Sequence, residues 1–422
     1  MRLPSPIRRL CGGLCLLLSL VVTARSEITG LILTWRQDPT TTQVIDWHQA
    51  GTEAATPRPF AYRVAPERRA DGANDAPWLN ATPEPARDFP FSDRKIYRVE
   101  LTGLRPDTRY EFRLGEDAPK TFRTLPATLT RPLRFMTGGD LMHEGDMFAQ
   151  MNRTAAALDP AFIIWGGDLA YENGAADQVK RMQLFVEIMQ QTLIAPDGRV
   201  IPVIVTAGNH EVIGGYYSKT AAAQAGQWPA TAAARAEIAP YYCALWAFPG
   251  HPGYGALDLG DYASLLLLDT DHTAPIEGAQ TDWLAQALRE RAHRPHLIPV
   301  YHVPGHPSAR PFDGSVSKKV RTHWLPLYDA AGVRLAFENH DHTYKRTKPW
   351  RAGKEDPAGV VYVGDGAWGV RVRDLEKEQP YLERFEKKNH GILLTMHPDR
   401  IELESISATG EVFDRFTVPA RK

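Results

Sequence analysis

The sequence predicts two layered domains, an all-β sandwich followed by a larger α/β domain. The stretch before Pro126 alternates apolar and polar residues with a period of two and contains no helical pattern of useful length. After Pro132, short apolar runs typical of buried strands are followed by segments with helical spacing. Hydrophobic residues make up 43% of the 422 residues and charged residues 23%, which excludes a chain that is disordered throughout.

Residues 1–26 have the composition of a secretory signal peptide. Arg2, Arg8 and Arg9 precede an apolar run at residues 10–22, and residues 24–26 offer the small side chains of a cleavage site. The run is shorter than the about 20 residues that a membrane-spanning helix needs. We therefore expect a cleaved leader and a secreted or periplasmic protein, with a retained membrane anchor as the alternative.

Removal of the leader would leave a mature chain with one cysteine and a small negative charge. The net charge changes from −1 to −5, because the leader contains four arginines and no acidic residue. Of three cysteines only Cys243 remains, so we expect no intramolecular disulfide. Without a basic excess, we expect no nucleic-acid-binding surface, and after removal of the leader no membrane span.

Residues 27–128 are expected to form the β sandwich. The runs with strand character are residues 31–35, 44–47, 97–101 and 110–114. Residues 52–90 are rich in Pro, Ala and Asp, which predicts long loops. The sequence LTGLRPDTRY at 101–110, closed by FRTLP at 122–126, resembles the end of a fibronectin type III-like domain.

Residues 129–420 are expected to form the α/β domain. Its predicted buried strands are residues 133–136, 162–165, 200–205, 264–268, 297–300 and 335–337, and its predicted helices are 149–158, 177–192 and 280–292. The alanine-rich residues 220–239 predict a helical excursion or a lid, and the alternation from 391 to 417 predicts a closing antiparallel meander. Functional loops are expected at the carboxyl ends of the strands.

Residues that can bind a metal follow five of the predicted strands. Asp140 follows the first, Asp168 the second and Asn209 the third, while His302 and the pair His340 and His342 follow two later strands. A single Gly-Asp pair would be weak evidence. Five strand ends that all carry oxygen or nitrogen ligands predict a metal site where these ends meet.

These residues occur in motifs that resemble the calcineurin-like metallophosphoesterases and, within them, the purple acid phosphatase branch. The motifs are GD at 139–140, GDLAY at 167–171, GNHE at 208–211, His302 and NHDHTYKR at 339–346. The resemblance implies a four-layer αββα sandwich for the catalytic domain, and a fibronectin-like module before it is typical of the branch. Asn339 stands where the family has Gly, and asparagine also tolerates a left-handed backbone.

By this resemblance, seven residues would hold two metal ions. The first ion would be bound by Asp140, Tyr171 and His342, the second by Asn209, His302 and His340, and Asp168 would bridge both. Phenolate and carboxylate oxygens suit Fe(III) at the first site, and mixed ligands suit Zn(II), Mn(II) or Fe(II) at the second. The alternative for Tyr171 is a tyrosine that only packs at a strand end.

The resemblance also implies hydrolysis of small phosphate monoesters, as in acid phosphatases, with metal-bound hydroxide attacking phosphorus in line. His210 is expected to bind the phosphate or to orient a ligand. For the general acid, His306 is the first candidate and His143 the second. A phosphodiesterase or nucleotide pyrophosphatase on the same metals is the alternative reaction. An adhesion or binding protein, with the fibronectin-like module as its active part, is the alternative from another class.

Other polar residues lack a ligand context. The turn GDG at 364–366 is expected to be structural. Six histidines are expected at the surface, namely His251, His272, His293, His296, His323 and His390.

Overall fold

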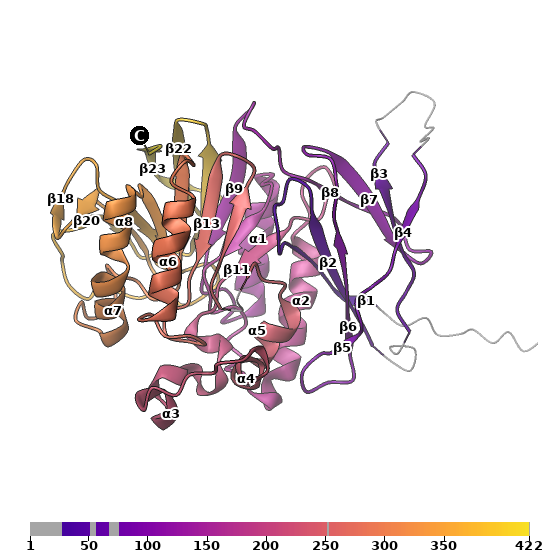
Figure 1. Ribbon diagram of the computed structural model, residues 1–422, viewed down its shortest axis with the longest axis horizontal. Coiled ribbons are helices and arrows are strands. Elements are labelled where there is room, and N and C mark those ends of the chain that lie inside the picture. Colours follow the sequence, from indigo (N-terminus) through magenta and orange to yellow (C-terminus); the bar gives the residue numbers. More distant parts are fainter. Residues whose placement is uncertain (1–27, 51–55, 67–75, 251–252, 422) are drawn as a thin grey trace, which may run out of the picture.

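The computed structural model describes residues 28–50, 56–66, 76–250 and 253–421 (Figure 1). The predicted leader of residues 1–26 lies outside the described residues. Within the described ranges, no helix is both long enough and apolar enough to cross a membrane. Figure 1 shows the β sandwich at one end of the molecule, beside α2 of the larger domain.

The sandwich consists of two four-stranded sheets, with strand orders β1-β2-β6-β5 and β4-β3-β7-β8. The first sheet contains β1 (Ile28–Thr34), β2 (Gln43–Gln49), β5 (Arg87–Asp88) and β6 (Lys95–Leu101), and the second β3 (Phe60–Val64), β4 (Leu79–Ala81), β7 (Arg109–Leu114) and β8 (Lys120–Arg123). The prediction of long loops over 52–90 was wrong for β3, β4 and β5. Phe60 on β3 is buried and pairs with Leu114, so contacts distant in the sequence override the loop composition.

The larger domain contains a six-stranded and a seven-stranded sheet. The first has the order β11-β10-β9-β21-β22-β23 and the second β12-β13-β14-β15-β19-β16-β20. The six strands are β9 (Leu133–Gly138), β10 (Ile163–Trp165), β11 (Val203–Val205), β21 (His390–Met396), β22 (Arg400–Ser407) and β23 (Val412–Pro419). The seven are β12 (Gly255–Leu259), β13 (Ala263–Leu267), β14 (His296–Val300), β15 (Leu335–Glu338), β16 (Tyr344–Thr347), β19 (Val361–Gly364) and β20 (Leu382–Glu386).

The two sheets enclose one apolar core and are covered by helices on their outer faces. Phe135, Phe162 and Ile298 belong to the buried cluster between the sheets. Helices α1 (Gly145–Ala157) and α2 (Val179–Thr192) cover the six-stranded sheet, and α6 (Ala279–Glu290), α7 (Ser315–His323) and α8 (Leu325–Ala331) cover the other. This arrangement confirms the predicted four-layer αββα sandwich.

Shorter elements lie between these layers. The alanine-rich insert contains α3 (Ala221–Gln224) and α4 (Ala232–Ile238), as predicted, and is followed by α5 (Pro240–Leu245). The short 3-10 helices are η1 (Ala176–Gln178), η2 (Asn209–Glu211), η3 (Ile213–Gly215) and η4 (Tyr217–Lys219), and β17 (Trp350–Arg351) pairs with β18 (Lys354–Glu355). The sequence did not reveal α7 and α8, whose apolar stripes are short.

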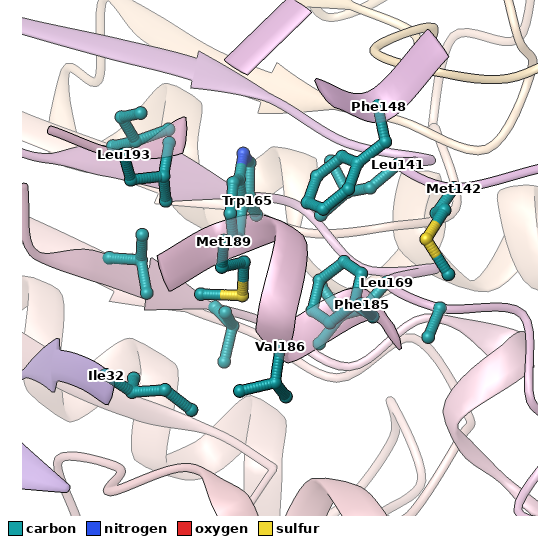
Figure 2. Close-up of a cluster of buried hydrophobic side chains, with 14 of the residues drawn as sticks. Ile32, Leu141, Met142, Phe148, Trp165, Leu169, Phe185, Val186, Met189 and Leu193 are labelled. Carbon is teal, nitrogen blue, oxygen red and sulfur yellow. The ribbon is translucent and has the colours of Figure 1, made fainter. Parts of the chain in front are cut away.

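Apolar and charged side chains join the sandwich to the larger domain. Figure 2 shows Ile32 of β1 beside Val186 and Met189 of α2, in a cluster of buried side chains. On the same sheet, Asp46 and Arg98 face each other across β2 and β6 and form a buried ion pair. Arg98 Nη2 also donates to the carbonyl of Leu245 at 3.2 Å, so the pair reaches α5 of the other domain.

Next to this pair, His48 is fully buried. Burial lowers its pKa to about 3, and the charges of Arg94, Arg87 and Arg98 act in the same direction. An unfolded chain binds a proton at this histidine near pH 6.5, whereas the folded chain does not. The contribution of His48 to stability is therefore present above pH 6.5 and is lost as the pH falls toward 3.

We predict that His48→Leu flattens the acid limb of the stability curve. Between pH 6 and 4, the free energy of unfolding of the variant should fall less steeply, by up to about 1.4 kcal/mol per pH unit, because one proton fewer is taken up on unfolding. Urea titrations at a series of pH values measure this slope. His293→Leu, at an exposed position, is the control. Equal slopes for wild type and His48→Leu would contradict the prediction.

Candidate metal centre

The seven predicted ligands lie in loops at the carboxyl ends of strands from both sheets. Asp140 follows β9, Asp168 and Tyr171 follow β10, and Asn209 opens η2 after β11. From the seven-stranded sheet, His302 follows β14, and His340 and His342 lie between β15 and β16. Because β9, β10 and β11 are parallel, as are β14 and β15, their carboxyl ends bring these loops to the same edge.

The first group of donor atoms surrounds Asp140. Its Oδ1 lies 3.1 Å from His342 Nε2 and accepts a hydrogen bond from the Tyr171 hydroxyl at 3.1 Å. The Tyr171 hydroxyl is also 3.1 Å from His342 Nε2. Asp140, Asp168 and His342 offer ligand atoms that all lie within 4.8 Å of one another.

The second group surrounds His302. Its Nε2 lies 3.1 Å from Asp168 Oδ2, 3.0 Å from His340 Nδ1 and 3.3 Å from Asn209 Oδ1. Asp168, His302 and His340 again offer ligand atoms within 4.8 Å of one another. Since Asp168 belongs to both groups, the two candidate metal positions are adjacent and share one carboxylate.

The hydrogen bonds that His302 and His342 make through Nδ1, on the side of the ring away from the centre, are consistent with metal binding by Nε2. His302 Nδ1 lies 2.8 Å from the carbonyl of Gly166, and His342 Nδ1 lies 3.3 Å from that of Arg371. A carbonyl can only accept, so each Nδ1 carries a proton, and each Nε2 is the ring nitrogen that is directed into the centre and can bind a cation once it is deprotonated. Lone pairs of nitrogen and oxygen that converge in a buried space are the donor set that a cation requires.

The charges of the centre also favour a cation. Burial lowers the pKa of His302, but the Asp168 and Asp140 carboxylates outweigh it and raise this pKa to about 9. Burial, followed by the charge of Asp140, raises the pKa of Tyr171 well above its usual value. The carboxylates of Asp140 and Asp168 contribute to both shifts, and a bound cation would neutralise their negative charge.

Five of the seven residues have a left-handed backbone. The φ angles are 55° for Asp140, 53° for Asp168, 59° for Tyr171, 78° for His340 and 60° for His342. Non-glycine residues rarely adopt this conformation, and such residues concentrate at functional sites. The loops are therefore held in a strained shape that aims the side chains at one another.

Asn339 acts differently from the expectation drawn from its sequence position. The left-handed conformation falls on His340 rather than on Asn339. The Asn339 amide donates to the carbonyl of Tyr301 at 2.9 Å and lies against Gly139 and Gly166, where a Cβ would overlap it. Its side chain thus fills the space between the β9 and β10 loops.

Two family profiles match this chain. One describes the N-terminal domain of purple acid phosphatases and matches residues 28–128, and the other describes calcineurin-like phosphoesterases and matches residues 137–344. The chain belongs to the purple acid phosphatase branch of the calcineurin-like phosphoesterases. The motifs from which the resemblance was recognised all lie within or next to the second match.

Relatives of this family occur in Arabidopsis thaliana. Purple acid phosphatase 18 is 29% identical over 322 residues, covering 71% of this chain and 65% of the relative. Purple acid phosphatase 21 is 26% identical over 324 residues, covering 72% and 65%. The matched part thus spans a little less than two thirds of these relatives.

Two solved structures share the fold. Purple acid phosphatase PPD1 from yellow lupin (Lupinus luteus) superimposes with a TM-score of 0.71 at 17% identity, covering 92% of this chain and 73% of that one. A structure of PhoD superimposes with a TM-score of 0.64 at 14% identity, covering 92% and 88%. At these identities the likeness concerns the fold.

Two of the three histidines predicted for catalysis border the centre of this phosphoesterase-family domain. The backbone N–H of His210 donates to Asp168 Oδ1 at 2.8 Å, and its Nδ1 lies 2.6 Å from Asn173 Oδ1. The His143 ring packs edge-on against Tyr171 with a centroid distance of 4.5 Å. Burial lowers the pKa of both histidines, that of His143 to about 4.

His306, the first candidate for the general acid, lies elsewhere. Its buried ring packs against Tyr362 and Tyr381, at centroid distances of 4.3 and 4.9 Å, and its carbonyl accepts from Lys345. Burial lowers its pKa to about 4. The expected position beside the metals is therefore not observed, because the loop after His302 turns its side chain into an aromatic pocket.

Two buried carboxylates support the centre: Glu211, which had no assigned role, and Asp365, in the turn that was expected to be structural. Glu211 accepts the N–H groups of Gly208, Asp168 and Leu169 at 2.6, 2.8 and 2.7 Å, which ties the β10 loop to the β11 loop. The Asp365 carbonyl accepts from the His342 N–H at 2.8 Å, and its carboxylate pairs with buried Lys345 at 2.9 Å. The two glycines that flank Asp365 in the sequence could have indicated that this turn lies close to the centre. A side chain at Gly366 would overlap the Asp140 carboxylate.

Three histidines expected at the surface are buried, namely His272, His296 and His390. His272 lies in the loop after β13, with its ring centroid 5.6 Å from that of His302. The surface prediction failed there because β13 also ends at this edge of the sheet. His251 lies outside the described residues.

Proposed function

We propose that this protein is an exported binuclear-metal hydrolase of phosphate monoesters. The observation that carries the proposal is the pair of adjacent donor groups that share Asp168. Family membership and the buried oxygen and nitrogen donors support it. Export rests on the predicted leader of residues 1–26, and the proposed domain limits are 27–128 and 129–420.

In this proposal, Asp140, Tyr171 and His342 hold Fe(III), and Asn209, His302 and His340 hold Zn(II), Mn(II) or Fe(II). Two such cations, when bound, polarise a phosphate oxygen and lower the pKa of water. The left-handed loops keep the ligands in place, so little reorganisation is needed when substrate binds.

His210 and His143 supply the polar side chains around the centre. His210 Nε2 lies 3.9 Å from Asp168 Oδ2, and Asn173 holds the opposite ring nitrogen. Because Asn173 Oδ1 accepts the Nδ1 proton, the neutral ring presents Nε2 as an acceptor, and only the protonated ring can donate from Nε2 to a phosphate oxygen. His143, on the Tyr171 side, is the candidate to move a proton to the leaving group.

Turnover and metal content test the proposal together. The purified full chain should contain two metal ions, hydrolyse phenyl phosphate, lose activity on chelation and recover it when metals are restored. Diphenyl phosphate, a phosphodiester, is assayed under the same conditions. A monoesterase hydrolyses phenyl phosphate faster, and a phosphodiesterase hydrolyses diphenyl phosphate faster. A metal-loaded protein that hydrolyses neither ester would overturn the proposal.

We predict that Tyr171→Phe removes the colour of the protein. A phenolate bound to Fe(III) absorbs visible light by charge transfer, so wild type with iron bound should be violet and the variant colourless. Visible spectra, recorded beside iron content by elemental analysis, measure this. Tyr241→Phe is the matched control, because its hydroxyl donates only to the carbonyl of Ala175. A colourless wild type that contains iron would contradict the role of Tyr171.

A further inference from the structure

We propose that Lys219, Arg310, Arg373 and Tyr216 form a second anion-binding subsite beside the metal centre. The subsite would select phosphate monoesters whose leaving group carries another anionic group, such as a carboxylate or a second phosphate. This inference rests on the proposed function and specifies its substrate class.

Tyr216 connects the metal centre to Lys219. It lies between η3 and η4, and its half-buried ring meets the ring of His340 edge-on at a centroid distance of 6.4 Å. Lys219 Nζ lies 3.5 Å from the centroid of the Tyr216 ring. This cation–π contact holds the exposed ammonium group against the Tyr216 ring, which itself contacts the candidate metal ligand His340.

Arg310 approaches the same histidine from another loop. Its Nη2 donates to the carbonyl of His340 at 3.3 Å, and its Nε lies 3.3 Å from the buried Oδ1 of Asp341. The guanidinium is thus anchored by one ion pair, while its side chain remains 29% exposed. It can therefore meet solvent or substrate beside His340.

Arg373 completes the group from the segment after β19. Its backbone N–H donates to the carbonyl of His342 at 3.0 Å, which fixes this residue at the edge of the centre.

The charge balance of this subsite favours an anion. Among the described residues, no carboxylate forms an ion pair with Lys219 or Arg373. Asp374, the acidic residue that follows Arg373 in the chain, is already paired with Lys387 at 2.7 Å. Arginine and lysine beside an aromatic hydroxyl suit a carboxylate or phosphate oxygen.

The test compares two substrates that differ in one charge. For wild type, kcat/KM should be higher with 4-carboxyphenyl phosphate than with phenyl phosphate. Lys219→Met and Arg373→Gln should each lower kcat/KM for the carboxylated substrate by about five- to tenfold, and that for phenyl phosphate by less than about twofold. Lys120→Met and Arg415→Gln, which remove exposed cations from β8 and β23, are the matched controls.

Binding keeps the test independent of turnover. Calorimetry with 4-carboxyphenylphosphonate and phenylphosphonate should show the same loss of preference in Lys219→Met and Arg373→Gln. Failure to hydrolyse either phosphate would overturn the proposed function, and the two phosphonates would still decide the subsite. Two ratios decide the subsite: kcat/KM for 4-carboxyphenyl phosphate over that for phenyl phosphate, and the corresponding ratio of binding constants for the two phosphonates. If both ratios are the same in wild type and in the two variants, the subsite does not exist.

Discussion

Asp168→Asn should reduce kcat/KM for phenyl phosphate by about 10³-fold or more, because loss of two-metal charge stabilisation is worth several kcal/mol. Asp168 is the residue that the two donor groups share, and its Oδ2 lies 3.1 Å from His302 Nε2. An amide of the same size cannot supply the negative charge that bridges two cations. Steady-state kinetics with metal added in excess measure the loss.

Metal content and folding separate this effect from general damage. Asp168→Asn should bind less than two equivalents of metal while keeping its far-ultraviolet circular dichroism. Asp399→Asn makes the same chemical change at a side chain that is 74% exposed, and its activity should equal that of wild type. Wild-type activity in Asp168→Asn would eliminate the bridging role.

Asp46→Asn should lower the free energy of unfolding by about 3–5 kcal/mol, because it leaves the guanidinium of Arg98 buried without its charge partner. The side chains of Asp46 and Arg98 are 0% and 2% exposed. The same guanidinium reaches the carbonyl of Leu245, so the loss should weaken the contact between sandwich and catalytic domain. Chemical denaturation followed by tryptophan fluorescence measures the change.

Replacement of both partners is the informative comparison. Asp46→Leu combined with Arg98→Met removes both charges and should recover most of the lost stability. Removal of the exposed pair of Arg415 and Glu404 should have a far smaller effect, since solvent screens it. If Asp46→Asn unfolds at the denaturant concentration of wild type, the ion pair does not stabilise the domain contact.

The order of the domains and the α/β class of the catalytic domain were predictable from strand and helix periods, whereas the four αββα layers were implied by the family resemblance. Strand and helix periods are local properties, and the buried runs before Asp140, Asp168 and His302 carry them clearly. Short elements such as α7, α8 and β4 were missed because their stability comes from packing rather than from their own pattern. The strand β3 was hidden for the same reason within a segment rich in Pro and Asp.

The sequence by itself predicted a cluster of metal-binding residues, because Asp140, Asp168, Asn209, His302 and the pair His340 and His342 follow predicted strands; Tyr171 entered only through the family resemblance. The positions of His306 and His272 were decided only by tertiary structure, since the direction of a loop side chain depends on what packs against it. The same holds for the role of Asn339 between two glycines and for the cations around Tyr216. Such contacts join segments far apart in the chain, and no local pattern records them.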